Sequence, residues 1–181
     1  MKRCILFTFA MAVVALASRA DAQHEFPKPG PEHEKLKIME GEWVSAIKMI
    51  DPESGKTHET TGSMSAKVDL DGFFLISKFK GSIGELPYEG RSITGYDPHK
   101  KKYIGVWVDS MGPGVYHTEG EWDKAGKEYK ESMEGPGPDG KPMHFRSVTT
   151  VDDDDHMTFT LFMKVADAEV QMMEIKHARK K

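Results

Sequence analysis

Regularly spaced turns are the feature that most restricts how this chain can fold. From Gly41 onward, clusters of Pro, Gly, Asp and Ser recur at intervals of about 8–15 residues, a spacing typical of sequential β-strands. Between these clusters apolar and polar residues alternate with period two, as expected of strands with one buried face. The turn clusters are 51–55, 69–72, 81–87, 97–100, 111–114, 123–126, 135–140, 152–155 and 166–167. Nine turns separate ten predicted strands.

The stretch from Gly90 to Gly120 shows this pattern most clearly. Its alternating runs are 89–96, 102–109 and 115–122, joined by two compact turns. No helical pattern of useful length interrupts the series, which argues against a βαβ architecture. Ten sequential strands normally close on themselves to remove their exposed edges. We therefore predict an all-β fold, an up-and-down antiparallel β-barrel of about ten strands.

Glycines inside the predicted strands support closure. A strand-interior glycine commonly marks a bulge or a tight bend at a barrel corner. These glycines are Gly62, Gly90, Gly95, Gly105 and Gly120. The run 102–109 is apolar on both faces, so the sequence does not decide which face points inward. One face holds Tyr103, Gly105 and Trp107, and the other holds Ile104, Val106 and Val108.

A short helix is predicted over residues 32–40, before the first strand. Leu36 and Met39 give it one apolar edge, Pro31 lies near its first turn and Gly41 follows its end. We expect it to lie across a barrel mouth or against the sheet. Residues 23–31, with three prolines, are predicted to be a linker.

The N-terminal residues 1–22 have the pattern of a secretory signal peptide. Lys2 and Arg3 precede an apolar run over 4–17, and small residues at 20–22 supply a cleavage site near Ala22. The alternative, an uncleaved anchor, requires a longer apolar run. We therefore predict export to the periplasm or the extracellular space, with one barrel domain over 32–177, a basic tail over 178–181 and no membrane span in the mature form.

Charge and cysteine usage exclude several functions. The chain of 181 residues has 25 basic and 29 acidic side chains. Removing residues 1–22, which hold three basic residues and one acidic residue, leaves 22 and 28, a net charge of −6. This acidic balance argues against nucleic acid as a partner. The one cysteine, Cys4, lies in the predicted signal peptide, so the mature chain has no disulfide, thiolate nucleophile or cysteine-ligated metal.

Two blocks of residues resemble known families. Gly41-Glu42-Trp43, just after a short helix, resembles the G-x-W signature of lipocalins, fatty-acid-binding proteins and nitrobindin-like barrels, the calycin group. A central block resembles the bacterial family called domain of unknown function 1579, over roughly residues 33–175. That block comprises Gly90, Gly95-Tyr96-Asp97, Lys101, Tyr103, Trp107, Asp109-Ser110-Met111, Gly114 and Gly120. The resemblance implies a calycin-like barrel and no established activity.

No metal site or cofactor is predicted from the residues. The histidines show no H-x-H or H-x-x-x-H spacing on one element. The acidic run 152–155 lacks the spacing of a calcium-binding loop and is interpreted as a solvated turn. Haem remains an alternative, because nitrobindin-like barrels use a histidine near the last strand, and His177 lies in that region.

No catalytic motif is present either. Asp109 at a strand end is expected to cap the following turn through backbone N–H groups. The alternative is a small enzyme in which Asp109 acts as an acid or base with Tyr96, Arg91 or His117 inside a polar barrel. We assign no catalytic residue.

The leading hypothesis is a barrel that binds a small apolar or amphipathic molecule. Three C-terminal strands place methionine and other apolar side chains on one face, and thioethers suit adaptable pockets. These residues are Met143, Phe145, Met157, Phe159, Leu161, Met163, Val170 and Met172. The candidate binding residues are Trp43, Arg91, Tyr96, Trp107, Asp109, Tyr116, His117 and Arg146. The aromatic residues would line or close the cavity, and Arg91 or Arg146 would meet a ligand carboxylate. A partner-binding module is a third possibility, favoured by an exposed apolar patch outside the barrel.

Overall fold

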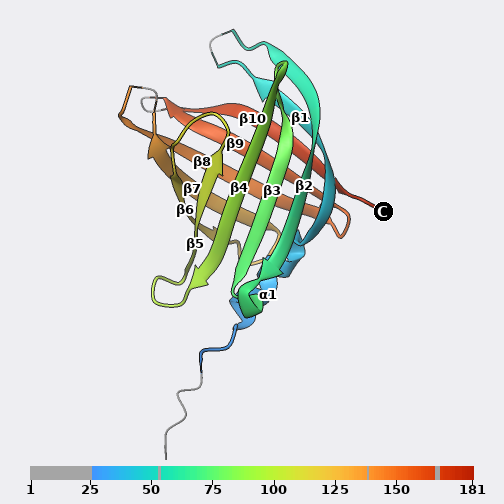
Figure 1. Ribbon diagram of the computed structural model, residues 1–181, viewed down its shortest axis with the longest axis vertical. Coiled ribbons are helices and arrows are strands. Elements are labelled where there is room, and N and C mark those ends of the chain that lie inside the picture. The colour runs from blue at the N-terminus through green and yellow to red at the C-terminus, as the bar shows by residue number, and fades with distance from the viewer. Residues whose placement is uncertain (1–25, 53, 138, 166–167) are drawn as a thin grey trace, which may run out of the picture.

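Ten antiparallel strands form a closed barrel (Figure 1). The computed structural model describes residues 26–52, 54–137, 139–165 and 168–181. Each strand pairs with its neighbours in sequence, and β1 closes the barrel by pairing with β10. The strands are β1 (Gly41–Ile50), β2 (Thr57–Asp69), β3 (Phe74–Ile83), β4 (Leu86–Asp97), β5 (Lys102–Asp109), β6 (Tyr116–Trp122), β7 (Glu128–Pro136), β8 (Pro142–Asp153), β9 (His156–Val165) and β10 (Ala168–Arg179). The predicted all-β, up-and-down barrel of ten strands is confirmed.

A short helical segment seals one end of the barrel. The helix α1 (Pro31–Glu34) continues as the 3₁₀ helix η1 (Lys35–Met39) and lies at the end where β1 begins (Figure 1). Leu36 is fully buried in a cluster with Ala66, Leu75, Tyr103 and Tyr129. The predicted N-terminal helix is thus confirmed, and it works as a plug because a single leucine fills the space between opposite walls. A second 3₁₀ helix, η2 (Leu70–Gly72), connects β2 to β3.

The ends of the domain differ slightly from the predicted boundaries. Pro31 belongs to α1 rather than to the linker, and β10 continues to Arg179 instead of ending at 177. Arg179 pairs in register with Trp43 of β1, so this part of the basic tail is a strand. The predicted signal peptide lies outside the described residues. In the described part of the chain, no helix is long and apolar enough to cross a membrane.

Burial decides which face of each strand points inward. Tyr103 on β5 is 4% exposed and belongs to the sealed core, whereas Ile104 and Val108 are 36% and 37% exposed. Because side chains alternate between faces, Gly105 and Trp107 also point inward and Val106 points outward. The sequence did not decide which face of this strand points inward. In the structure it is the face with Tyr103, Gly105 and Trp107.

The strand glycines do not coincide with the irregularities in strand pairing. Among the described strands, register shifts lie at Val151/Asp153 and Gln171/Met173 and not at these glycines. A Cβ on Gly90 would overlap the Trp107 ring, and one on Gly120 would lie 2.6 Å from the Tyr129 hydroxyl. The predicted bulge is therefore wrong at Gly90 and Gly120, where glycine makes room for a neighbouring aromatic ring, while the tight bend given as its alternative stays a prediction.

The irregularity in β10 changes which of its residues face the interior. Val170 pairs with Met163, and after the shift Met173 pairs with Leu161. Met173 rather than Met172 then packs against the inner cluster of Ile47, Phe79 and Ile175. The predicted inner position of Met172 is therefore wrong, because one extra residue in the strand reverses the alternation.

Candidate functional site

The inner face of the barrel has three levels, beginning with the sealed end beside α1. Trp43 is 2% exposed, and its Nε1 donates to the carbonyl of Met39 at 3.2 Å. The Arg179 guanidinium lies 4.1 Å from the centre of the Trp43 ring and donates to the carbonyl of Glu40. These contacts join η1, β1 and β10 and leave no opening at Trp43.

A layer of buried polar side chains lies above the sealed end. We call it the polar layer, and it consists of Ser45, Thr94, Thr118, Glu131, Ser147, Thr149 and His177. Except for the half-buried Glu131, each of these residues is at most 9% exposed. Buried polar groups cost free energy unless they are hydrogen-bonded, so the partners of this layer decide what it does.

His177 has partners that account for its burial. Its Nδ1 lies 2.9 Å from the Ser45 hydroxyl, and its ring makes an edge contact with Trp43. Burial lowers the pKa of His177 to about 4, so the imidazole is neutral at physiological pH. The position considered for haem is thus part of the packed end of the barrel.

Glu131 on β7 is the acidic residue of the polar layer. Tyr129 donates its hydroxyl hydrogen to Glu131 Oε1 at 3.3 Å, and Ser147 donates to Oε2 at 3.5 Å. Both bonds are long, so they only partly replace water. Burial raises the pKa of Glu131, and the nearby hydroxyls of Thr118, Tyr129 and Ser147 partly oppose that rise.

Two buried donors on β6 lack a partner among the described residues. They are the Thr118 hydroxyl and the indole N–H of Trp122. The Thr118 oxygen faces Glu131, but no partner meets it at hydrogen-bond geometry. Gly105 packs closely against this hydroxyl, because a Cβ there would lie only 2.9 Å from Thr118 Oγ1.

Above the polar layer, inward side chains are only half-buried. We call this level the open half, because its residues point inward from the strand ends opposite α1 and still keep accessible surface. They are Tyr88, Trp107, Tyr116, Met133, Phe145, Phe159, Leu161, Met163 and Met173. Aromatic rings and thioethers dominate this wall, as in the pockets that take small apolar molecules.

Asp109 fixes two aromatic side chains at the rim of the open half. Its Oδ2 accepts from Trp107 Nε1 at 3.0 Å and from the Tyr88 hydroxyl at 3.2 Å. Its Oδ1 accepts from the backbone N–H of Met111, which confirms the predicted turn cap. Burial and the neighbouring carboxylate raise the pKa of Tyr88, so that this hydroxyl stays protonated.

The predicted site residues fall into three groups. Trp107, Asp109 and Tyr116 lie on the open half. Trp43 and Tyr96 point inward at the sealed end, where Tyr96 packs on His33 of α1 and on Tyr103. Arg91, His117 and Arg146 lie on the outer face, because their strand neighbours Ser92, Thr118 and Ser147 point inward.

The two arginines expected to meet a ligand carboxylate are held by acidic partners outside the barrel. Arg146 makes a bidentate contact with Glu169 at 2.6–2.9 Å and stacks on Phe162. Arg91 pairs with Glu89 at 3.2 Å. This corrects the expectation that an arginine lies within reach of an interior ligand. The same placement separates Asp109 from Arg91 and His117, its predicted acid–base partners.

Sequence reasoning did not single out Glu131, Thr118 or Ser147. The signal for Glu131 was present, since it alternates with Tyr129 and Met133 on an otherwise apolar face. Its significance depends on which face points inward, and that was decided only by the packing.

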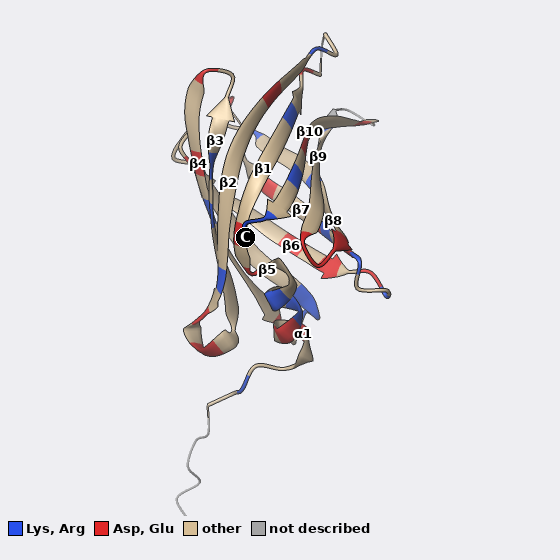
Figure 2. Cartoon of the chain, turned by 90° about the vertical axis from the view of Figure 1, so that its right-hand side faces the viewer, with Lys and Arg blue, Asp and Glu red and all other residues tan. Residues whose placement is uncertain are grey.

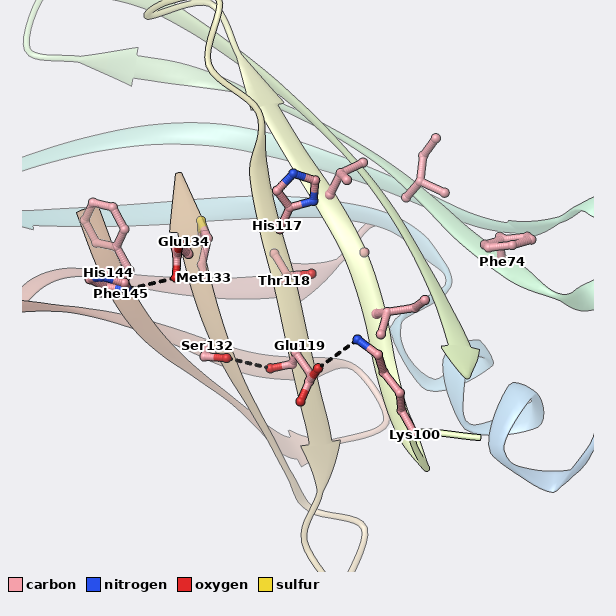
Figure 3. Close-up of a pocket in the computed structure, with 14 residues that line it drawn as sticks. Phe74, Lys100, His117, Thr118, Glu119, Ser132, Met133, Glu134, His144 and Phe145 are labelled. Carbon is pink, nitrogen blue, oxygen red and sulfur yellow. Dashed lines mark hydrogen bonds and ion pairs between the residues drawn. The ribbon is translucent and has the colours of Figure 1, made fainter. Parts of the chain in front are cut away.

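An open groove of about 790 Å³ lies on the outside, across β3 to β8. Figure 3 shows the contact between Glu134 and His144 on this face. The His144 Nδ1 atom lies 3.3 Å from the Glu134 carboxylate. Among the described residues, no group of three His, Cys, Asp or Glu side chains is arranged to hold a metal ion. The apolar edge of the groove, formed by Phe74, Ile93 and Ile104, is 36–44% exposed, but nothing in the structure shows what would cover it.

The family assignment follows from the whole length of the barrel. The family model "Protein of unknown function (DUF1579)" matches residues 28–179, which include α1 and all ten strands. The chain belongs to the DUF1579 family. Its resemblance to that family, noted from the central block, is thus confirmed. No curated protein matches the sequence of this DUF1579 member significantly.

Solved structures share the fold of this DUF1579 protein at low sequence identity. Rv2717c from M. tuberculosis has a TM-score of 0.64 and 13% identity, over 84% of this chain and 99% of that one. The S-type phycobiliprotein lyase CPES from Guillardia theta has a TM-score of 0.57 and 10% identity, over 83% and 93%. These likenesses support a calycin-like barrel and carry no residue-level role to this chain.

Proposed function

We propose that this DUF1579 protein binds a small amphipathic molecule in the open half of its barrel. The observation that carries the proposal is the division of the inner face. A half-buried wall of aromatic, methionine and leucine side chains ends on a layer that holds Glu131 and the unpartnered Thr118. Such a surface can bury the apolar chain of a ligand and form hydrogen bonds with the polar end of the same ligand.

Catalysis has less support than binding. Asp109 accepts hydrogen bonds from Trp107, Tyr88 and the Met111 backbone, and no histidine or arginine of the described residues is bonded to it. Glu131 has only hydroxyl partners. A proton-transfer enzyme needs an acid or base within reach of a positioned substrate, and these partners favour holding a ligand over reacting with it.

We also propose that the protein acts after export, on the grounds of the N-terminal sequence pattern. The measurement is N-terminal sequencing of the protein recovered from the periplasm or the medium. A mature chain beginning at Gln23 is expected. Retention of residues 1–22 in the cytosol would refute export and leave ligand binding untouched.

A blocking substitution tests the binding site directly. Leu161 of β9 is half-buried on the open half, whereas the adjacent Thr160 points outward and pairs with Val148 and Glu174. We expect Leu161→Arg to abolish the fluorescence gain of Nile red, a neutral apolar dye, because a long charged side chain would occupy the apolar space. Thr160→Arg is the matched control and should bind the dye as the parent does. Equal dye binding by both variants would contradict an interior site.

A further inference from the structure

The charged side chains that point into the barrel are mainly acidic. Among the described strand residues, the inward positions hold two carboxylates, Asp109 and Glu131, and no lysine. Arg179 is the one inward arginine and is stacked on Trp43 at the sealed end. Lysine and arginine positions (blue) and acidic positions (red) both occur along the strands (Figure 2), and outer pairs such as Lys102–Glu121 and Arg146–Glu169 join the two signs. The interior is therefore a poor environment for an anion.

Glu131 is better placed than Asp109 to receive a ligand. Three donors surround the Asp109 carboxylate and fix it to its own turn. Glu131 accepts only two long bonds, and as a carboxylate it has room for about four hydrogen bonds. It lies directly below Met133, at the point where the polar layer meets the open half.

An unpartnered hydroxyl marks the same place independently. Thr118 is 8% exposed, and within the part of the chain that the structure describes its Oγ1 has no partner at hydrogen-bond geometry, although it lies close enough to Glu131 to lower the pKa of that carboxyl. A buried hydroxyl without a partner is destabilising by about 1–3 kcal/mol. A ligand group that forms a hydrogen bond with it would remove this cost and so bind more tightly.

Resting on the ligand-binding function proposed above, we propose that Glu131, assisted by Thr118, receives the polar end of the ligand. That end is a hydrogen-bond donor without negative charge, either an ammonium or a hydroxyl group. The apolar part of the same molecule then lies against Met133, Phe145 and Leu161. Fatty acids and other anionic amphiphiles are expected to bind more weakly, because among the described strand residues no lysine or arginine of the open half points inward to meet their head group.

Calorimetric titration with three matched probes tests this assignment. Dodecylamine, dodecanol and dodecanoate share one chain and differ in the head group, and each is used below its micelle-forming concentration at neutral pH. We expect the amine to bind most tightly, the alcohol more weakly and the carboxylate most weakly. Because this order is measured on the unsubstituted protein, it does not depend on any variant folding.

Two variants on one strand then locate the effect. Glu131→Gln should lower dodecylamine affinity about tenfold and narrow the gap to dodecanoate, because it removes a charge that pairs with the amine. Glu134→Gln removes an exposed outer carboxylate of the same strand and should leave all three affinities unchanged. If the alcohol binds most tightly and Glu131→Gln lowers its affinity, the head group is assigned as a hydroxyl.

The failures of the two proposals are distinguishable. Tightest binding of dodecanoate, or affinities that Glu131→Gln leaves unchanged for both amine and alcohol, would overturn the role of Glu131 while the ligand-binding function stands. If none of the three probes binds and Nile red also fails to bind, the ligand-binding function itself is wrong.

Discussion

At Thr118 the requirements of stability and of the proposed ligand binding conflict. Its side chain is buried on β6 and its hydroxyl is left without a hydrogen bond, although a valine of the same shape would avoid that cost. Stability alone would therefore favour valine at this position. A hydroxyl kept under these conditions is typical of a residue that serves a ligand.

Thr118→Val is expected to stabilise the unliganded protein by about 1 kcal/mol, since it removes an unsatisfied buried hydroxyl and keeps the volume. Urea unfolding measures this change. The same variant should bind dodecylamine and dodecanol more weakly. A loss of stability of similar size would show that the hydroxyl has a partner in the folded protein, and the argument from an unpartnered group would fail.

His177 provides a pH-dependent test at the residue scale. The folded protein keeps this imidazole neutral down to a pKa of about 4, whereas the unfolded chain takes up the proton near pH 6.5. The unfolded state therefore binds more protons between these values, so stability falls as the pH falls through that window. The expected loss is about 2 kcal/mol between about pH 7 and pH 4.5.

The measurement is the unfolding free energy of the parent and of His177→Gln over this pH range. Glu131 acts in the opposite direction, because its raised pKa favours the protonated folded state and its contribution is lost as the pH rises. The difference between parent and variant cancels that effect. A His177 ring signal that titrates near pH 6.5 in the folded protein would refute the assignment.

At the scale of the element, the α1–η1 segment holds the sealed end together. Leu36 is fully buried between β2, β3, β5 and β7, and the Tyr103 hydroxyl donates to the Glu32 carbonyl at 2.7 Å. Leu36 is the most deeply buried side chain of this short segment, so we expect it to contribute most to holding the segment in place.

Leu36→Ala should lower the free energy of unfolding by about 2–5 kcal/mol, the range for a leucine truncated in a packed core. Ile38→Ala is the control, because Ile38 is 37% exposed on the same 3₁₀ helix and should cost less than about 1 kcal/mol. Chemical unfolding followed by tryptophan fluorescence measures both. Similar losses for the two variants would mean that the segment does not plug the barrel.

The positions of strands and turns were easier to predict from this sequence than the strand face that points into the barrel. Turn clusters of Pro, Gly and Asp are local signals, so the ten strands and the cap at Asp109 could be predicted. The inward face of β5 could not be predicted, because both faces of this strand are apolar. Only the packing of Tyr103 against Leu36 shows which face points inward. The irregularity at Gln171/Met173 has no local signal either, and it reverses the alternation after it.

The candidate site was predicted only in part for the same reason. Trp107, Asp109 and Tyr116 were found as aromatic and polar residues of the central strands. Arg91 and Arg146 were selected for their charge, but their positions in the alternation place them outside, beside Glu89 and Glu169. Glu131 was overlooked because a lone carboxylate gains meaning only when its surroundings are known to be the barrel interior.

At the scale of the whole molecule, the barrel is sealed at α1 and accessible at the opposite end. Sealed-end residues such as Trp43 and Tyr103 are almost fully buried, whereas Trp107, Met163 and their neighbours keep accessible surface. This gradient runs along the barrel axis and ends on the polar layer. The proposed ligand would lie against the half-buried apolar residues of the open half, with its polar end at the polar layer.

Methyl NMR on methionine-labelled protein during titration with dodecylamine tests this account most directly. Methionines lie at every level, with Met133, Met163 and Met173 on the open half, Met39 behind the Leu36 plug and Met111 exposed on a turn. The account predicts saturable shifts of the first three methyl signals and none at Met39 or Met111. Shifts confined to Met111, or unchanged inner methyls at saturating amine, would contradict an interior site.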